Sequence, residues 1–148
     1  MKVKDNERKK FEAAFKKLLK LRVNLGAVGT HAGTDLTNAE LMKVHEFGVT
    51  TKTVHIPARA PIRTTFRDSG NIQRLSKNIS GLILKNGVYG YSAIGNGIAE
   101  TMKQMVRKTI MKRVTPPNKE STLARKKGDI PLIDTKQMVN SIEADFND

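Results

Sequence analysis

One helical pattern near the middle of the chain limits the possible folds more than any other feature. Apolar residues recur there at intervals of three and four, and lysines and arginines occupy the other side. This spacing predicts a long helix from Ala93 or Asn96 to Val114 with one buried face. The sequence TPPN, residues 115–118, ends this helix, because proline cannot continue it. The residues expected on the buried face are Ile98, Met102, Met105, Val106, Thr109 and Ile110.

The first part of the chain predicts two more helices separated by a strand. Residues 6–21 have an apolar stripe and a lysine-rich face, which is typical of an amphipathic helix. Apolar and polar residues alternate over residues 22–29, which indicates a half-buried strand. Thr37 and Glu40 then form a capping-box pattern at the start of a helix that Gly48 ends. The residues expected on its buried side are Leu41, Val44 and Phe47.

The segments before the long helix are less regular. Threonines and prolines favour an extended backbone over residues 49–61, and a short helix is expected over 62–67. Residues 70–86 have helical spacing, which Gly81 interrupts. Glycines are frequent in residues 86–97, so this segment predicts turns.

The end of the chain predicts small elements only. Residues 115–128 are expected to form an exposed basic loop with at most one helical turn. A short helix through Met138 and Val139 and a last strand from about Ser141 follow. Residues 1–148 therefore predict a single α+β domain, in which a small, mostly antiparallel sheet packs against one long and several shorter helices.

Composition excludes several classes of function. The chain has no cysteine, which excludes disulfides, thiolate metal sites and a cysteine nucleophile. No segment approaches the roughly 20 apolar residues that span a bilayer, so we expect a soluble protein with no membrane partner. No known catalytic motif is present, and a His31–Asp35 pair is better explained as part of a polar loop. We therefore expect no enzyme activity, no catalytic residues, no cofactor and no metal.

The charge favours an acidic partner. The net charge is +13, and this excess attracts either nucleic acid phosphates or acidic protein surfaces. A basic region over residues 103–127 precedes an acidic end over residues 129–148, which is a weak indication that copies pair head to side. The basic face of the long helix could follow a phosphate backbone or simply be solvated. The candidate contacts to DNA or to an acidic partner are Lys103, Arg107, Lys108, Lys112, Arg125, Lys126 and Lys127.

Three segments together resemble a known group of proteins. They are AELMKVHEFG (39–48), IPARAPIR (56–63) and TPPNKESTLARKKGDIPLIDTKQMVNSI (115–142). Their order and spacing resemble the neck and tail-completion proteins of tailed bacteriophages, which include the HK97-type neck and Mu-type virion morphogenesis families. The sequence departs from that pattern where Ala60 and Pro61 replace a proline and an aromatic residue. Lys136 also replaces a glycine.

The resemblance implies a structural virion protein. Its subunits would form a ring, expected to be a hexamer, around the DNA channel at the head–tail junction. The partners would be copies of itself, other neck, head-completion or tail-terminator proteins, and passing double-stranded DNA, which it would contact non-specifically. The protein would be made in the bacterial host cytoplasm and end in the virion. The alternative is a free-standing basic protein that binds DNA independently of sequence.

In this interpretation the segment IPARAPIR (56–63) belongs to a structural joint that supports assembly. Arg59 and Arg63, four residues apart, are positioned to pair with carboxylates. Asp134 and Thr135 would cap the following helix through their side-chain oxygens. The residues of the joint are Glu46, Phe47, Gly48, Ile56, Pro57, Ala58, Arg59, Arg63, Pro116, Pro117, Asn118, Asp134 and Thr135.

Overall fold

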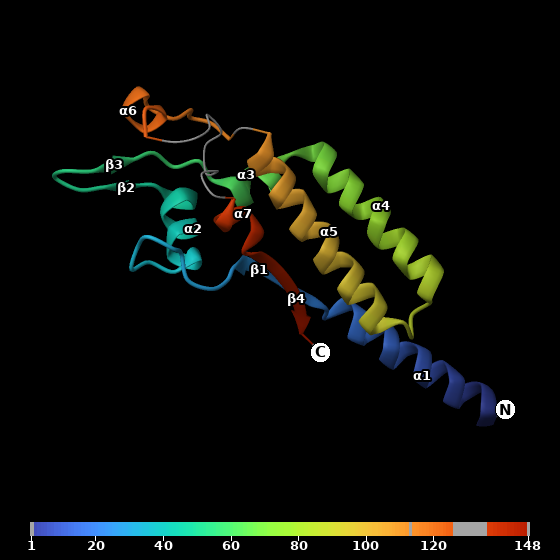
Figure 1. Ribbon diagram of the computed structural model, residues 1–148. Coiled ribbons are helices and arrows are strands. Elements are labelled where there is room, and N and C mark those ends of the chain that lie inside the picture. The colour runs from blue at the N-terminus through green and yellow to red at the C-terminus, as the bar shows by residue number, and fades with distance from the viewer. Residues whose placement is uncertain (1, 113, 126–135, 148) are drawn as a thin grey trace.

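Helix α5 (Tyr91–Met111) is the element against which most of the protein packs. The computed structural model describes residues 2–112, 114–125 and 136–147, with side chains from residue 4 onward. Helix α4 (Ser69–Asn86) runs alongside α5, and the strands β1 (Arg22–Ala27) and β4 (Ile142–Asn147) cross its other side (Figure 1). The fold is α+β, as the sequence predicts.

The sheet joins the two ends of the chain. Strands β1 and β4 pair antiparallel in a register that sets Ala27 opposite Ile142 and Arg22 opposite Asn147. Because side chains alternate along a strand, Ile142 and Phe146 face α5. Glu143 and Asp145 are exposed, and the Glu143 carboxylate reaches Lys103 and Arg107 of α5. A second antiparallel pair, β2 (Val49–Thr50) and β3 (His55–Ile56), forms a separate hairpin that extends from the body (Figure 1). The strands near residues 22 and 141 were correctly predicted, but the sheet is divided into two small ladders.

The predicted buried stripe of the long helix forms the centre of the core. Val106 and Ile110 are fully buried, and Ile98 and Met105 are also in the core. Met102 and Thr109 are partly buried. The residues packed around them come from other elements and include Ala27, Met42, Met138, Val139 and Ile142.

The prediction of turns over residues 86–97 is wrong for the second half of that segment, because α5 already begins at Tyr91. Two of the glycines lie inside the helix, where they allow close packing. A Cβ on Gly95 would lie 2.5 Å from the ring of Phe146, and a Cβ on Gly97 would lie 2.7 Å from Leu82 of α4. These glycines therefore bring the strand and the neighbouring helix close to α5.

The other predicted helices form, with some changes. Helix α2 (Asn38–Phe47) has the complete capping box between Thr37 and Glu40. Helix α4 is continuous through Gly81, which is exposed and would meet no atom within 4 Å if it had a Cβ. The short helices are α3 (Pro61–Arg67), α6 (Glu120–Leu123) and α7 (Gln137–Asn140).

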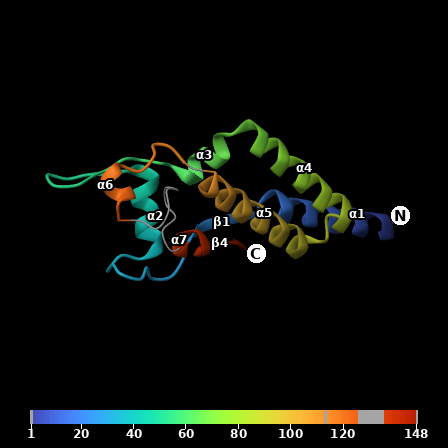
Figure 2. The same cartoon turned by 45° about the horizontal axis from the view of Figure 1, so that its top comes forward.

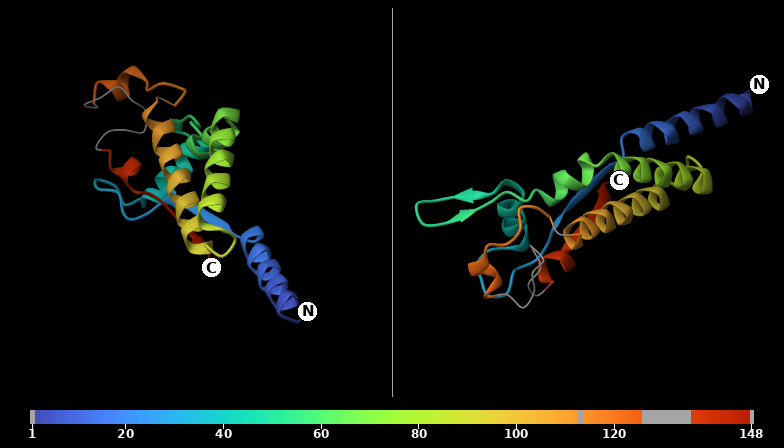
Figure 3. Two further views of the ribbon diagram at one scale, coloured as in Figure 1. Left: turned by 90° about the vertical axis from the view of Figure 1, so that its right-hand side faces the viewer. Right: turned by 90° about the horizontal axis from the view of Figure 1, so that it is seen from above.

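Helix α1 (Lys2–Leu19) extends away from the rest of the protein (Figures 1 and 3), and its first turns also project past α4 and α5 in Figure 2. It starts four residues earlier than predicted and ends two residues earlier. Only its last part meets α5, where the Lys17 ammonium lies 4.2 Å from the centre of the Tyr91 ring. No helix in the described part of the chain is both long and apolar enough to cross a membrane.

Candidate functional site

Gly48 brings the end of α2 against the end of β3 and the residues that follow it. Its φ of 75° lies in the left-handed region that favours glycine. A Cβ at this position would also lie 2.8 Å from the Ala58 nitrogen and 3.0 Å from the Ile56 oxygen. Both the backbone conformation and the space therefore require glycine here. The HEFG and IPAR motifs are in direct contact at this point.

Glu46 connects α2 to the start of α3. Its carboxylate is buried and accepts hydrogen bonds from the backbone nitrogens of Ile62 at 2.9 Å and Arg63 at 3.0 Å. These are the N–H groups that a helix leaves unpaired in its first turn, and an anion is favoured there. The same carboxylate forms an ion pair with Arg63, from Nε at 2.9 Å. Arg63 also donates to the Glu46 carbonyl oxygen.

The turn before α3 has an unusual backbone. Ala60 has a φ of 43°, in the left-handed region, and Pro61 follows as the first residue of the helix. Proline suits that first position because no intrahelical bond is lost there. A proline at position 60 could not adopt this positive φ, so the turn requires another residue there.

Arg59 connects the IPAR part of the joint to its TPPN part, far along the chain. Its guanidinium donates from Nε to the Pro116 carbonyl at 3.0 Å, and from Nη2 to Pro117 at 3.4 Å and to Asn118 Oδ1 at 3.3 Å. Its backbone nitrogen donates to the His45 carbonyl at 2.8 Å. Burial of the side chain lowers the Arg59 pKa. The backbone of Arg59 thus joins the IPAR segment to α2, and its side chain joins the same segment to the TPPN segment.

Phe47 occupies a different position from the one the helical spacing predicts. It is 64% exposed, and the Arg63 guanidinium lies over its ring at 4.9 Å from the centroid. The prediction that Phe47 is buried is wrong. The reason is that Glu46 takes the buried position in the last turn of α2, where it caps α3. Leu41 and Val44 are partly buried, in agreement with the prediction.

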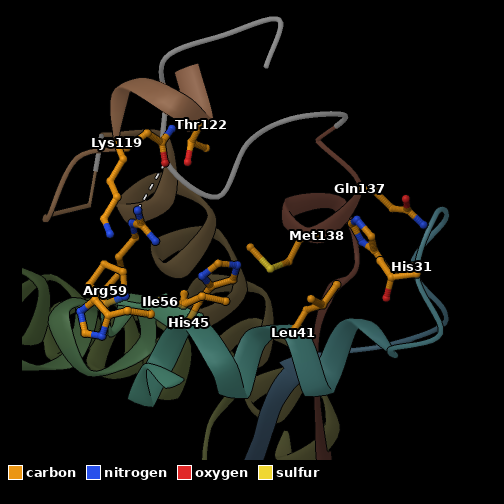
Figure 4. A pocket seen from close by; sticks show the side chains of 13 residues that line it. His31, Leu41, His45, Ile56, Arg59, Lys119, Thr122, Gln137 and Met138 are labelled. Carbon is orange, nitrogen blue, oxygen red and sulfur yellow. Dashed lines mark hydrogen bonds between the residues drawn. The ribbon is translucent and has the colours of Figure 1, made fainter. Parts of the chain in front are cut away.

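A cavity of about 360 Å³ lies beside the joint (Figure 4). Leu41, Ile56, Pro57 and Met138 supply apolar walls, and His31, His45 and Arg59 supply polar groups. The side chain of His31 contacts that of Asn38, with 2.9 Å between His31 Nδ1 and Asn38 Oδ1. No group of three or more His, Asp or Glu side chains able to hold a metal occurs among the described residues.

The basic side chains predicted on one face of α5 fall into two groups, one bonded within the protein and one exposed. Lys103 contacts Glu100 at 2.7 Å and Glu143 at 3.3 Å, and Arg107 contacts Glu143 at 3.4 Å. Arg107 also donates to the carbonyls of Asn140 at 3.0 Å and Ile142 at 2.8 Å. The Lys103 and Arg107 side chains are only 16% and 24% exposed, and they hold β4 against α5.

The pKa values of this cluster follow from its contacts. Hydrogen bonds to Glu100 and Glu143 raise the Lys103 pKa. Hydrogen bonds from Gln104 and Lys103 lower the Glu100 pKa. The charged forms are therefore favoured. Lys103 and Arg107 are engaged within the protein, and an interpretation that leaves them free for DNA is not supported by these contacts.

The remaining predicted basic contacts are exposed or lie outside the described residues. Lys108 and Lys112 are exposed beside Asp68 and Arg74 at the end of α5. Arg125 is exposed after α6. Lys126, Lys127, Asp134 and Thr135 lie outside the described residues, so the expected cap on α7 cannot be compared.

Two buried polar residues were missed by the sequence analysis. Asn38 donates to the carbonyls of Val28 at 2.8 Å and Thr30 at 3.1 Å, and so attaches α2 to the chain after β1. Thr65 donates to Pro61 and lies 2.7 Å from Thr109, which connects α3 to α5. Thr109 belonged to the predicted buried stripe. A polar member of such a stripe indicates that a buried hydrogen-bond partner is needed.

Comparison with protein-family models, with curated proteins and with solved structures found no match to this chain.

Proposed function

We propose that this chain is a structural subunit of the head–tail junction of a tailed bacteriophage. It would form part of a ring around the DNA channel and join head to tail. The observation that carries the proposal is the joint itself. Two of the segments that resemble neck and tail-completion proteins are close in sequence and the third is far away, yet Glu46, Arg59 and Arg63 connect all three through direct hydrogen bonds.

A second observation supports the same proposal. Lys136 has a φ of 61°, and it stands where the family pattern has glycine. Glycine is the residue that adopts this conformation without strain. The backbone at this position therefore has the form that the pattern would require, although the residue has changed.

The experiment is electron microscopy of a lysate from the parent phage with this gene deleted. The proposal predicts DNA-filled heads separated from tails, or tails with abnormal ends. A plasmid copy of the gene should restore normal particles, and a copy with a stop codon after α1 serves as the control. Intact infectious particles from the deletion phage would contradict the proposal.

The second candidate is a free-standing DNA-binding protein that does not read sequence. The net charge of +13 favours it, together with the exposed lysines of α1. Its test is the salt dependence of duplex binding, because each neutralised phosphate contributes a log–log slope of about −0.9. Absence of binding near physiological salt would contradict it. The same result is compatible with a junction subunit.

A further inference from the structure

The cavity beside the joint has an unbalanced charge. Among the residues that the structure describes, 13 line it, and none of them is an aspartate or a glutamate. The same lining includes one arginine, one lysine and three histidines. Partly buried cations elsewhere in the protein have acidic partners, because Lys103 and Arg107 are both paired with Glu143. The described wall of the cavity therefore holds cations without a matching acid.

Arg59 is the most buried of these cations, with only 9% of the residue exposed. Its bonds from Nε and Nη2 go to neutral acceptors of residues 116–118, and Nη1 donates to no residue that the structure describes. Burial lowers the Arg59 pKa, as expected where no acid offsets the loss of water around the charge. A buried cation without an anion is unfavourable, so this end of the cavity favours an anionic group.

The cavity has a charged end and a neutral end (Figure 4). Lys119 is exposed and forms no ion pair within the described residues, and it lies beside Arg59 at the charged end. At the neutral end, Gln137 lies near His31. Leu41 and Met138 lie between the two ends and supply apolar wall.

The neutral end offers a hydrogen-bond acceptor. The Asn38 amide nitrogen donates to the carbonyls of Val28 and Thr30, so its Oδ1 is the acceptor that faces His31. His31 Nδ1 therefore carries a proton in that contact, and Nε2 of the neutral ring is left as an acceptor. A peptide N–H is a donor that suits this position.

The size of the cavity favours a segment of chain over a bare ion. Its volume of about 360 Å³ lies within the range of ligand sites, roughly 300–1,000 Å³. A bare phosphate or acetate would leave the apolar wall without a partner. The exposed residues His55 of β3 and Thr122 of α6 belong to its lining, and both elements lie at the same end of the molecule (Figures 1 and 3). A polypeptide can therefore approach from that end.

We propose that this cavity binds an acidic segment of a partner polypeptide. A carboxylate of the segment pairs with Arg59 and Lys119, and a neighbouring apolar side chain packs against Leu41 and Met138. The charge-assisted bonds to the guanidinium fix the position of the carboxylate, and the apolar contact selects an acidic residue that has an apolar neighbour. The assignment rests on the cavity and goes beyond the proposed function, since a partner of this chemistry can bind inside or outside a virion.

The test is nuclear magnetic resonance of the isotope-labelled full chain with three probes at millimolar concentration. The first probe is N-acetyl-leucyl-glutamate amide, the second is its uncharged analogue N-acetyl-leucyl-glutamine amide, and the third is sodium acetate. We expect the glutamate peptide to bind about tenfold more tightly than either of the others, because only it has both the charge and the apolar side chain. Its binding should shift the signals of Leu41, Ile56 and Met138.

Three variants connect the binding to the cavity. Arg59→Gln should abolish the preference for the glutamate peptide. Lys119→Gln should weaken the binding of that peptide about threefold, as expected for an exposed ion pair. The matched control is Lys43→Gln, which removes the same charge from an exposed position of α2 outside the lining and should change nothing. If Arg59→Gln does not fold, the comparison of Lys119→Gln with Lys43→Gln still decides.

Four results would overturn the proposal. They are equal affinities for the glutamate and glutamine peptides, acetate binding as tight as that of the glutamate peptide, signal shifts outside the cavity only, and equal effects of Lys119→Gln and Lys43→Gln. Absence of binding by the glutamate peptide would overturn it as well.

Discussion

Replacing Glu46 with glutamine tests the physical basis of the joint. The carboxylate accepts from two backbone nitrogens and from Arg63 Nε, and its two oxygens divide these bonds between Ile62 and Arg63. Glutamine keeps the shape but presents one N–H₂ group where an acceptor is needed. A lost hydrogen bond to a charged group costs roughly 1.5–3 kcal/mol. The lost anion at the α3 N-terminus adds up to about 1–2 kcal/mol. Together they predict that Glu46→Gln lowers the free energy of unfolding by about 2–4 kcal/mol.

The assay is urea unfolding followed by far-ultraviolet circular dichroism, since the chain has no tryptophan to report fluorescence. The matched control is Glu100→Gln. Glu100 also contacts a cation, Lys103 at 2.7 Å, but its side chain is 54% exposed. An exposed pair contributes roughly 0–1 kcal/mol, so the control should change little. Equal losses for the two variants would refute the claim that Glu46 holds α2 and α3 together.

Four other substitutions test local structure. Lys136→Gly should raise the free energy of unfolding by about 0.5–1 kcal/mol in thermal unfolding, because a left-handed residue other than glycine costs roughly 1–2 kcal/mol; a loss would contradict the conformation at φ 61°. Gly95→Ala should destabilise by about 1–3 kcal/mol because its Cβ would overlap an aromatic ring of β4. Gly81→Ala, on the exposed side of α4, should stabilise by about 0.5–1 kcal/mol. Stability changes of the same sign for Gly95→Ala and Gly81→Ala would contradict this prediction. Thr37→Ala should cost about 1 kcal/mol through loss of the α2 cap. Hydrogen bonds from Thr37 lower the Glu40 pKa, so the carboxylate's part of the cap is fully present above the unfolded pKa of about 4.3 and is lost as the pH falls through the lower folded pKa. The Thr37 hydroxyl still accepts from the Glu40 nitrogen at acid pH, so the difference between Thr37→Ala and wild type in urea unfolding should narrow there without vanishing.

The sequence predicts those elements whose signals are local. The buried stripe of α5 and the capping box of α2 are encoded within a few neighbouring residues, and both are present. The glycines at the start of α5 could not be interpreted in the same way. Gly95 is required by Phe146, which lies far away in sequence, and no local pattern contains that information.

The joint was predicted only in part for the same reason. The sequence indicated that Arg59 and Arg63 pair with carboxylates, which is confirmed for Arg63 and wrong for Arg59. Arg59 instead donates to the acceptors of the TPPN segment, 57 to 59 residues away. Lys103 and Arg107 were predicted as a free basic face because Glu143 becomes their neighbour only when β4 packs on α5.

The most direct test of the central claim is immunogold electron microscopy of intact virions from the parent phage, with antibodies raised against the purified protein. Virions complemented after deletion of the gene are compared with deletion particles as the negative control. A junction subunit predicts gold at the point where head meets tail, in wild-type and complemented particles only. Virions without label at that point, after the antibody has been shown to recognise the protein in dissociated particles or in the lysate, would contradict the account.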